Sequence, residues 1–224
     1  MKRYNFTINE MLAVIAIIMV LAGLLFPTLS LARARAKATS CAGNQGQISK
    51  ILLDSMSRTK DKLTSGASED NLWTTALYNR NILTSLDYAR CPAFEYTKNN
   101  ITEEDARKEA MKEAYGVVIA TDGKLNFASK KNRIVDGNEI SPNKMLLGGC
   151  AANKWGEDAT ATAALDFSTN KLIAIHRGEV NVFFLDGSVM SMDEDAFTTN
   201  SIYYPKADNS TAVQVTNSMV HKEK

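Results

Sequence analysis

The pattern of apolar and polar positions changes sharply about thirty residues into the chain. From Met11 to Ala32 no side chain is charged, and most positions are apolar. A helix rises about 1.5 Å per residue, so this run is long enough to cross a hydrocarbon core about 30 Å thick. Arg33, Arg35 and Lys37 end the run. We therefore predict a membrane-spanning helix.

A second helical pattern follows the apolar run. Apolar or uncharged residues recur at spacings of three and four, which is typical of a helix with one buried face. They are Ala34, Ala38, Cys41, Gln45, Ile48, Leu52 and Met56. The charged residues Arg35, Lys37, Lys50, Asp54 and Arg58 lie off this stripe. We predict that residues 33–64 continue the helix as an amphipathic half that packs against another element.

Beyond residue 65 the pattern changes to short segments. Helical spacing at 71–86 predicts one or two short helices, and a further helix is expected from Thr102 to about Ala114. The first turn of that helix is acidic, which suits the positive end of a helix dipole. After Gly116, short apolar runs predict strands at 117–120, 125–127, 144–147, 171–175, 180–185 and 188–192.

Two Asp-Gly dipeptides predict hairpin turns among these strands. Asp122-Gly123 lies between the first two strands, and Asp186-Gly187 lies between the last two. We expect Asp186 to occupy a left-handed turn position. The end of the chain is rich in Ser, Thr and Asn, and we expect roughly its last 10–15 residues to be poorly ordered.

Composition narrows the function classes. The chain has 224 residues, of which 26 are basic and 25 acidic. No excess of either charge points to a nucleic-acid partner. Three cysteines and two histidines are too few for a zinc framework or a disulfide-dense scaffold, and we expect no metal site. The length left after the apolar run suits one domain of ordinary size.

The start of the apolar run carries a family resemblance. Phe6-Thr7-Ile8-Asn9-Glu10 and the run after it resemble the N-terminus of type IV pilins and type II secretion pseudopilins, whose common form is Gly-Phe-Thr-Leu-Ile-Glu-Leu. Pro27 matches a helix-bending proline of many members. Asn5 stands where the family usually has Gly, and Asn9 where it has an apolar residue.

This resemblance implies a processing step and an assembly contact. A prepilin peptidase would cut between Asn5 and Phe6 and methylate the new amine, so that residues 1–5 are a leader. Glu10 would then occupy the position of the family's Glu. A carboxylate beside lipid is costly unless it finds a cation, and the Phe6 amine of a neighbouring subunit is the expected partner. Such a pair specifies the stagger between subunits more than it adds stability.

The C-terminal hairpin carries a second resemblance. His176, nine residues, and then Asp186-Gly187 resemble the His-x9-Asp-Gly signature of a large pilin-like family with type II secretion G-like N-termini. Thr39-Ser40-Cys41 and Cys91-Pro92 also resemble that family.

Two other interpretations of the N-terminus stay open. The apolar run is a removable secretory signal if cleavage follows Ala32-Arg33-Ala34 or Ala34-Arg35-Ala36, although it is longer than the usual signal core. It is a plain anchor if no cleavage occurs. Basic residues are about equal on its two flanks, so the charge rule does not settle orientation. The family resemblance implies a single-pass protein of the inner membrane with its head outside the cytoplasm.

The acidic and histidine candidates also allow more than one interpretation. His176 and Asp186 are metal ligands, an acid–base pair or, as we expect, a hydrogen-bonding residue and a turn residue. Calcium-binding major pseudopilins hold calcium in a C-terminal loop, which makes weak calcium candidates of four nearby residues, Asp186, Asp193, Glu194 and Asp195. Their spacing matches no known oxygen-ligand loop.

The cysteines allow a disulfide or a nucleophile. Cys41 on the stripe and Cys91 before Pro92 are predicted to form a disulfide that ties the long helix to the head. Buried free thiols are the alternative, and Cys150 would be left over. Cys91 or Cys150 with His176 as base would make a nucleophile. No third orienting group is evident, and we expect no enzyme.

These patterns together predict an α+β protein, in which a long N-terminal membrane-spanning helix continues into an amphipathic half packed on an antiparallel β-sheet head. The segments are the leader 1–5, the membrane half 6–32, the amphipathic half 33–64 and the head 65–224 with a flexible C-terminal tail.

The expected function is structural: a subunit of a type IV pilus-like or type II secretion pseudopilus filament. The resemblance implies other pilin-like subunits, a prepilin peptidase, an inner-membrane assembly platform and the lipid bilayer as partners. The alternative is a non-polymerising, membrane-anchored protein whose head binds a ligand such as a glycan. Phe6 and Glu10 discriminate between the two, because a bare anchor needs neither.

Overall fold

A computed structural model describes residues 7–60, 62–66, 68, 72–94, 96, 104–120, 123–126, 133–153, 161–206 and 211–222. The predicted leader and Phe6 lie outside these residues. The chain divides into two compact units, residues 1–36 and 37–224, and helix α1 (Ile8–Arg58) belongs to both.

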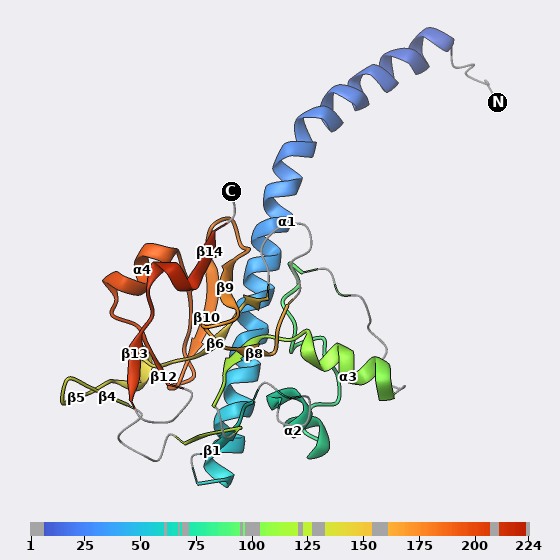
Figure 1. Cartoon of the computed structure of the whole chain (residues 1–224). Coiled ribbons are helices and arrows are strands. Elements are labelled where there is room, and N and C mark those ends of the chain that lie inside the picture. The colour runs from blue at the N-terminus through green and yellow to red at the C-terminus, as the bar shows by residue number, and fades with distance from the viewer. Residues whose placement is uncertain are drawn as a thin grey trace. The chain divides into compact units, whose positions relative to one another are not determined.

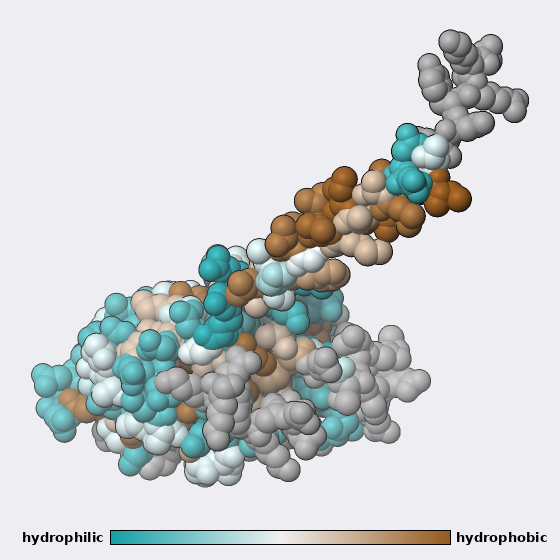
Figure 2. All heavy atoms as spheres, turned by 90° about the horizontal axis from the view of Figure 1, so that it is seen from above, coloured by the Kyte–Doolittle hydropathy of each residue, from teal (hydrophilic) through white to brown (hydrophobic). Residues whose placement is uncertain are grey.

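The described part of the N-terminal unit is the first part of α1, and its apolar side chains are exposed. Among the described residues, every exposed large apolar side chain except Met190 lies between Ile8 and Leu31. Figure 2 shows these residues as a brown segment. The helix is long and apolar enough to cross a membrane, and Pro27 lies inside it without ending it. The predicted apolar helix is therefore confirmed, while membrane insertion stays a prediction.

The second half of α1 is amphipathic, as predicted. Cys41, Gln45, Ile48, Leu52 and Met56 are buried, whereas the five charged residues off the stripe are exposed. The helix ends at Arg58 and not near residue 64. Lys60 adopts a left-handed conformation (φ 55°), which stops the helix, and β1 (Lys62–Thr64) follows.

A five-stranded sheet packs along this half of α1 (Figure 1). Its order is β11 (Val189–Met192), β10 (Val180–Phe184), β6 (Leu146–Gly149), β2 (Gly116–Val118) and β8 (Ala164–Leu165). All pairs are antiparallel except β2 with β8. The hairpin of β10 and β11 confirms the prediction made from Asp186-Gly187.

A three-stranded sheet contradicts the predicted flexible tail. Its order is β14 (Val220–Lys222), β9 (Lys171–Ala174) and β7 (Ala151–Ala152), and β14 runs parallel to β9. Val215 and Val220 are buried. The prediction failed because most residues near the C-terminus are polar and only a few are apolar. The segment is held in place by β9, a strand some fifty residues earlier in the chain.

The other strands of the described residues form three two-stranded ladders: β1 with β3 (Lys124–Asn126), β4 (Ile134–Val135) with β5 (Asn138–Glu139), and β12 (Tyr203–Pro205) with β13 (Ala212–Gln214). The predicted hairpin at Asp122-Gly123 is wrong. Strands form on both sides of it, but β2 pairs with β6 and β8 while β3 pairs with β1. Both strands find longer-range partners that a local turn signal does not reveal.

Short helices cover the remaining core. In the part of the chain that the structure describes they are α2 (Trp73–Asn79), α3 (Glu104–Lys112) and α4 (Glu194–Thr199), with 3₁₀ turns η3 (Pro142–Lys144) and η4 (Asn217–Met219). α2 and α3 confirm the helices predicted there, although the predicted start of α3 lies outside the described residues. The buried Trp73 indole donates to the carbonyls of Tyr115 and Ala163, which joins α2 to the sheet. The fold is α+β, as predicted.

Candidate functional site

Four side chains from distant parts of the chain meet in the core of the C-terminal unit: Cys41, Cys91, Cys150 and His176. Cys41 comes from α1, Cys91 from the turns that follow α2, Cys150 from the link between β6 and β7, and His176 from the residues after β9. Their sulfur and ring nitrogen atoms all lie within 4.8 Å of one another. Each residue is at most 5% exposed. We call these residues the Cys3His cluster.

The contacts inside the Cys3His cluster are short. Cys41 Sγ lies 3.4 Å from Cys150 Sγ. His176 Nε2 lies 3.3 Å from Cys91 Sγ and 3.7 Å from Cys150 Sγ. Such a set of soft sulfur atoms and one imidazole has the chemistry of a metal site. The structure thus brings together residues that were considered only pairwise from the sequence, as a disulfide or as a nucleophile with its base.

Two buried polar side chains lie within hydrogen-bond distance of the sulfur atoms. Gln45 Nε2 lies 3.4 Å from Cys150 Sγ and 3.7 Å from Cys41 Sγ, and it donates to the Asn181 carbonyl at 2.9 Å. That carbonyl is an acceptor, so it fixes the amide with its N–H groups toward the cluster. Tyr115 Oη lies 3.3 Å from the Cys41 carbonyl oxygen and 3.5 Å from Cys41 Sγ, so its one proton has two acceptors at Cys41. The surroundings therefore suit sulfur atoms that accept hydrogen bonds, as thiolates do.

Ionisation within the cluster is uneven. Burial raises the pKa of the Cys91 and Cys150 thiols well above their usual range. Burial also opposes ionisation of Cys41, but hydrogen bonds from Cys150, Cys91 and His176 outweigh it and lower the pKa of that thiol. The cluster therefore holds a negative charge most readily at Cys41.

The three cysteines are free in the structure. The Cys41–Cys91 disulfide stays a prediction, but Cys150 is not left over, because its sulfur contacts both Cys41 and His176. The expectation that the chain has too few cysteines and histidines for a zinc site also needs revision. Three cysteines and one histidine are a complete set of four ligands once the fold gathers them.

The two halves of the His-x9-Asp-Gly signature lie apart. His176 sits at the tight turn before β10, where it exchanges backbone hydrogen bonds with Glu179, and Asp186 follows the other end of β10. A strand of this length spans about 17 Å, which excludes a metal site or acid–base pair shared by His176 and Asp186.

The Asp186-Gly187 turn differs in detail from the prediction. The left-handed residue is Gly187 (φ 86°), and Asp186 is not among the residues with positive φ. Asp186 Oδ1 instead accepts hydrogen bonds from the Ser188 amide and hydroxyl at 2.9 and 2.6 Å. The Asp186 carboxylate therefore stabilises the turn through its hydrogen bonds with Ser188, as in an Asx turn.

This hairpin docks on α1. Asn181 Nδ2 donates to the Ala38 carbonyl at 2.9 Å, and Ser49 Oγ lies 3.3 Å from the Gly187 carbonyl and 3.1 Å from the Gly46 carbonyl, which share its proton. A Cβ at Gly187 would lie 3.1 Å from Leu53 Cδ1. The signature hairpin therefore positions the long helix on the sheet at both ends of β10.

We expect Gly187→Ala to destabilise the protein by about 2 kcal/mol, because a side chain is strained at positive φ and would press on Leu53. Gly137→Ala is the matched control, since Gly137 has a similar φ (81°) with open space around its Cβ position. Chemical denaturation of the two variants measures the difference. Equal losses in the free energy of unfolding would show that the Leu53 side chain moves away at no energetic cost.

The four weak calcium candidates are not gathered into one place. Asp186 precedes β11, whereas Asp193, Glu194 and Asp195 follow it. Asp193 Oδ1 caps α4 by accepting from the Ala196 amide, and Asp195 Oδ1 accepts from Asn217. The carboxylates of Asp186, Asp193 and Asp195 thus have structural partners.

Glu10 takes part in a contact that the sequence analysis did not anticipate. Its Oε2 accepts from the Thr7 amide at 2.8 Å and from the Thr7 hydroxyl at 2.7 Å, while the Glu10 amide donates to Thr7 Oγ1 at 3.3 Å. This is a capping box at the start of α1. The Thr-x-x-Glu spacing could have revealed it.

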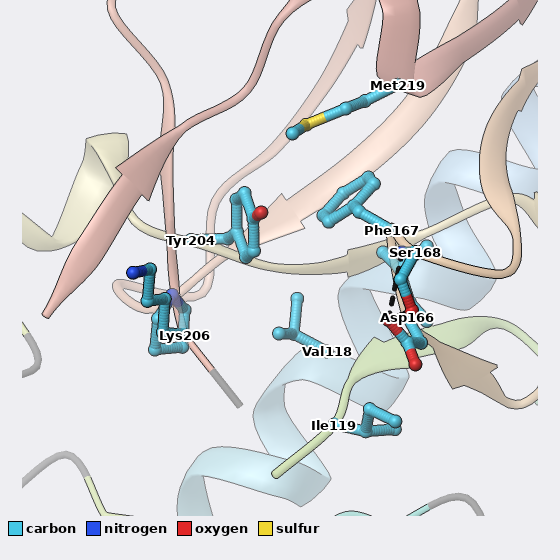
Figure 3. Close-up of a pocket in the computed structure, with 10 residues that line it drawn as sticks. Val118, Ile119, Asp166, Phe167, Ser168, Tyr204, Lys206 and Met219 are labelled. Carbon is cyan, nitrogen blue, oxygen red and sulfur yellow. Dashed lines mark hydrogen bonds between the residues drawn. The ribbon is translucent and has the colours of Figure 1, made fainter. Parts of the chain in front are cut away.

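A groove of about 280 Å³ opens on the C-terminal unit (Figure 3). The rings of Phe167 and Tyr204 meet there with centroids 4.5 Å apart, and Asp166 and Lys206 lie at its sides (Figure 3). Burial, followed by the charge of Asp166, raises the pKa of the Tyr204 hydroxyl. The groove offers a small apolar surface with charged groups of both signs beside it.

Comparisons of the chain with protein-family models, curated proteins and solved structures found no match.

Sequence reasoning missed the roles of Gln45, Tyr115 and Asn181 around the Cys3His cluster. One signal was present. Gln45 is a polar residue in the middle of an otherwise apolar stripe, and such a residue needs a buried partner. Tyr115 and Asn181 carry no comparable local signal.

Proposed function

We propose that the protein is a structural subunit of a type IV pilus-like or type II secretion pseudopilus filament, made from a precursor and assembled through its N-terminal helix. The observation that carries the proposal is the coincidence of two features. The residues Phe6–Glu10 resemble the prepilin processing motif, and the helix they introduce leaves its apolar side chains exposed from Ile8 to Leu31.

An apolar surface of that length requires a cover. Lipid covers it before assembly, and the helices of neighbouring subunits cover it within a filament. The same segment thus serves as an anchor and as an assembly surface. The α+β unit after it has its own core, which suits a head carried outside the membrane.

The test is the mass of the mature chain extracted from membranes. We expect loss of Met1 to Asn5 and an N-methyl group on Phe6. A chain that still begins at Met1, or one that begins near Arg35, would overturn the proposed processing.

The groove at Phe167 and Tyr204 favours a second candidate, the anchored binding protein that does not polymerise. Two tilted aromatic rings beside polar groups suit a small ligand with an apolar face. Assembly tests of Glu10 variants separate the two candidates, because a bare anchor does not need this carboxylate.

A further inference from the structure

We propose that Cys41, Cys91, Cys150 and His176 bind one zinc ion that fixes α1 to the sheets of the C-terminal unit. The proposal begins with the ligand set. Three thiolates and one imidazole are a recurrent donor set of structural zinc sites, which are four-coordinate and closed to solvent. All four side chains here are buried, and no further ligand is needed to complete the site.

The distances fit a tetrahedron around zinc. With zinc–sulfur bonds of about 2.3 Å and a zinc–nitrogen bond of about 2.0 Å, neighbouring ligand atoms are separated by about 3.8 Å for sulfur pairs and about 3.5 Å for sulfur and nitrogen. Three of the six observed separations are 3.4 Å for Cys41 and Cys150, 3.3 Å for Cys91 and His176, and 3.7 Å for Cys150 and His176. All six are within 4.8 Å. Small shifts would accommodate the ion.

The polar neighbours suit the charge of such a site. Zinc with three thiolates and a neutral imidazole carries one net negative charge, which is costly in a core without donors. The Gln45 amide points its N–H groups at Cys150 and Cys41, and the Tyr115 hydroxyl lies within reach of Cys41 Sγ. Contacts of this kind orient ligands and tune metal affinity.

The site also gives the odd number of cysteines a common role. A single disulfide would leave one buried thiol unpaired, whereas zinc uses all three. Because the four ligands come from α1, the turns after α2, the β6–β7 link and the residues after β9, the ion would link segments across most of the folded unit. His176 of the His-x9-Asp-Gly resemblance then has a defined chemical role.

The experiment uses the full chain, purified in detergent without a polyhistidine tag or chelator. Elemental analysis should find about one zinc per chain, and exchange into cobalt under anaerobic conditions should give the absorption of a tetrahedral thiolate complex. X-ray absorption of the zinc protein should show three sulfur neighbours and one nitrogen. This measurement needs no variant and is independent of any effect of mutation on folding.

Variants then locate the site. His176→Ala and Cys150→Ser should lower the zinc content at least about tenfold, whereas His176→Cys should retain it, since four thiolates also bind zinc. His221→Ala is the matched control, because it removes the only other histidine and should leave the content unchanged. If His176 were only a hydrogen-bonding core residue, there would be no reason for His176→Cys to keep the zinc that His176→Ala loses.

Peptide mapping after alkylation without reductant completes the test. A disulfide between any two of the three cysteines in the purified protein would overturn the proposal. So would a metal-free chain, iron or copper in place of zinc, or zinc that remains in both His176→Ala and Cys150→Ser.

Discussion

Gly148→Ala is expected to destabilise the C-terminal unit by about 3 kcal/mol or more, a large part of the roughly 5–15 kcal/mol that stabilises a folded domain. Gly148 lies in β6, which is paired on one side with β10 and on the other with β2. An added Cβ would lie 2.2 Å from the Gly116 carbonyl oxygen and 2.6 Å from Phe183 Cζ. The carbonyl belongs to the neighbouring strand and is not free to move away.

Denaturant unfolding of the full chain in detergent, followed by tryptophan fluorescence, measures this loss. Gly43→Ala is the control, because Gly43 is exposed in α1 and nothing lies within 4 Å of its Cβ position. That variant should gain about 1 kcal/mol from helix propensity. A change of less than about 0.5 kcal/mol in Gly148→Ala would mean that the strands separate more easily than their packing indicates.

Glu10→Leu should leave membrane insertion intact and abolish filament assembly. A carboxylate that faces lipid costs about 2.5 kcal/mol or more near the bilayer centre, and less at the interface, so an apolar residue favours insertion. Under the proposed function, Glu10 is retained because it pairs with the Phe6 amine of a neighbouring subunit. Membrane fractionation measures insertion, and cysteine crosslinking between neighbouring helices measures assembly.

The capping box at Thr7 makes this test sharper. Glu10→Gln keeps the shape and can still serve in a capping box, but it loses the charge. Thr7→Ala removes the cap, at about 1 kcal/mol, and keeps the charge. If the charge matters, Glu10→Gln impairs assembly and Thr7→Ala does not. The reverse result would assign Glu10 to helix capping alone. Normal crosslinking of Glu10→Leu would favour the anchored binding protein.

Local signals predicted much of the fold. The buried face of α1 was readable because residues three and four apart share one side of a helix, and Ile48, Leu52 and Met56 are buried accordingly. The turn at Asp186-Gly187 was readable because the dipeptide favours a tight turn between two strands. The hairpin predicted at Asp122-Gly123 was wrong because the strands on its two sides pair with segments far away in the chain.

The candidate functional residues also divide into a feature that the local sequence contains and one that it does not. The Thr7–Glu10 capping box needs only a spacing of three, so the sequence contained it although we did not predict it. The Cys3His cluster contains no short metal-binding motif, since Cys41 and Cys150 are separated by 109 positions. Nothing in the spacing of its members distinguishes ligands from buried thiols.

The sequence by itself determined the long helix, its apolar and amphipathic halves, the α+β class and the C-terminal hairpin, because these follow from periodicity and turn chemistry over a few residues. Only the tertiary structure decided that β14 pairs with β9, that β3 pairs with β1, and that three cysteines and His176 meet in one buried place. The physical reason is that such contacts are chosen by the packing of the whole core, where each strand and side chain competes for partners far away in the chain.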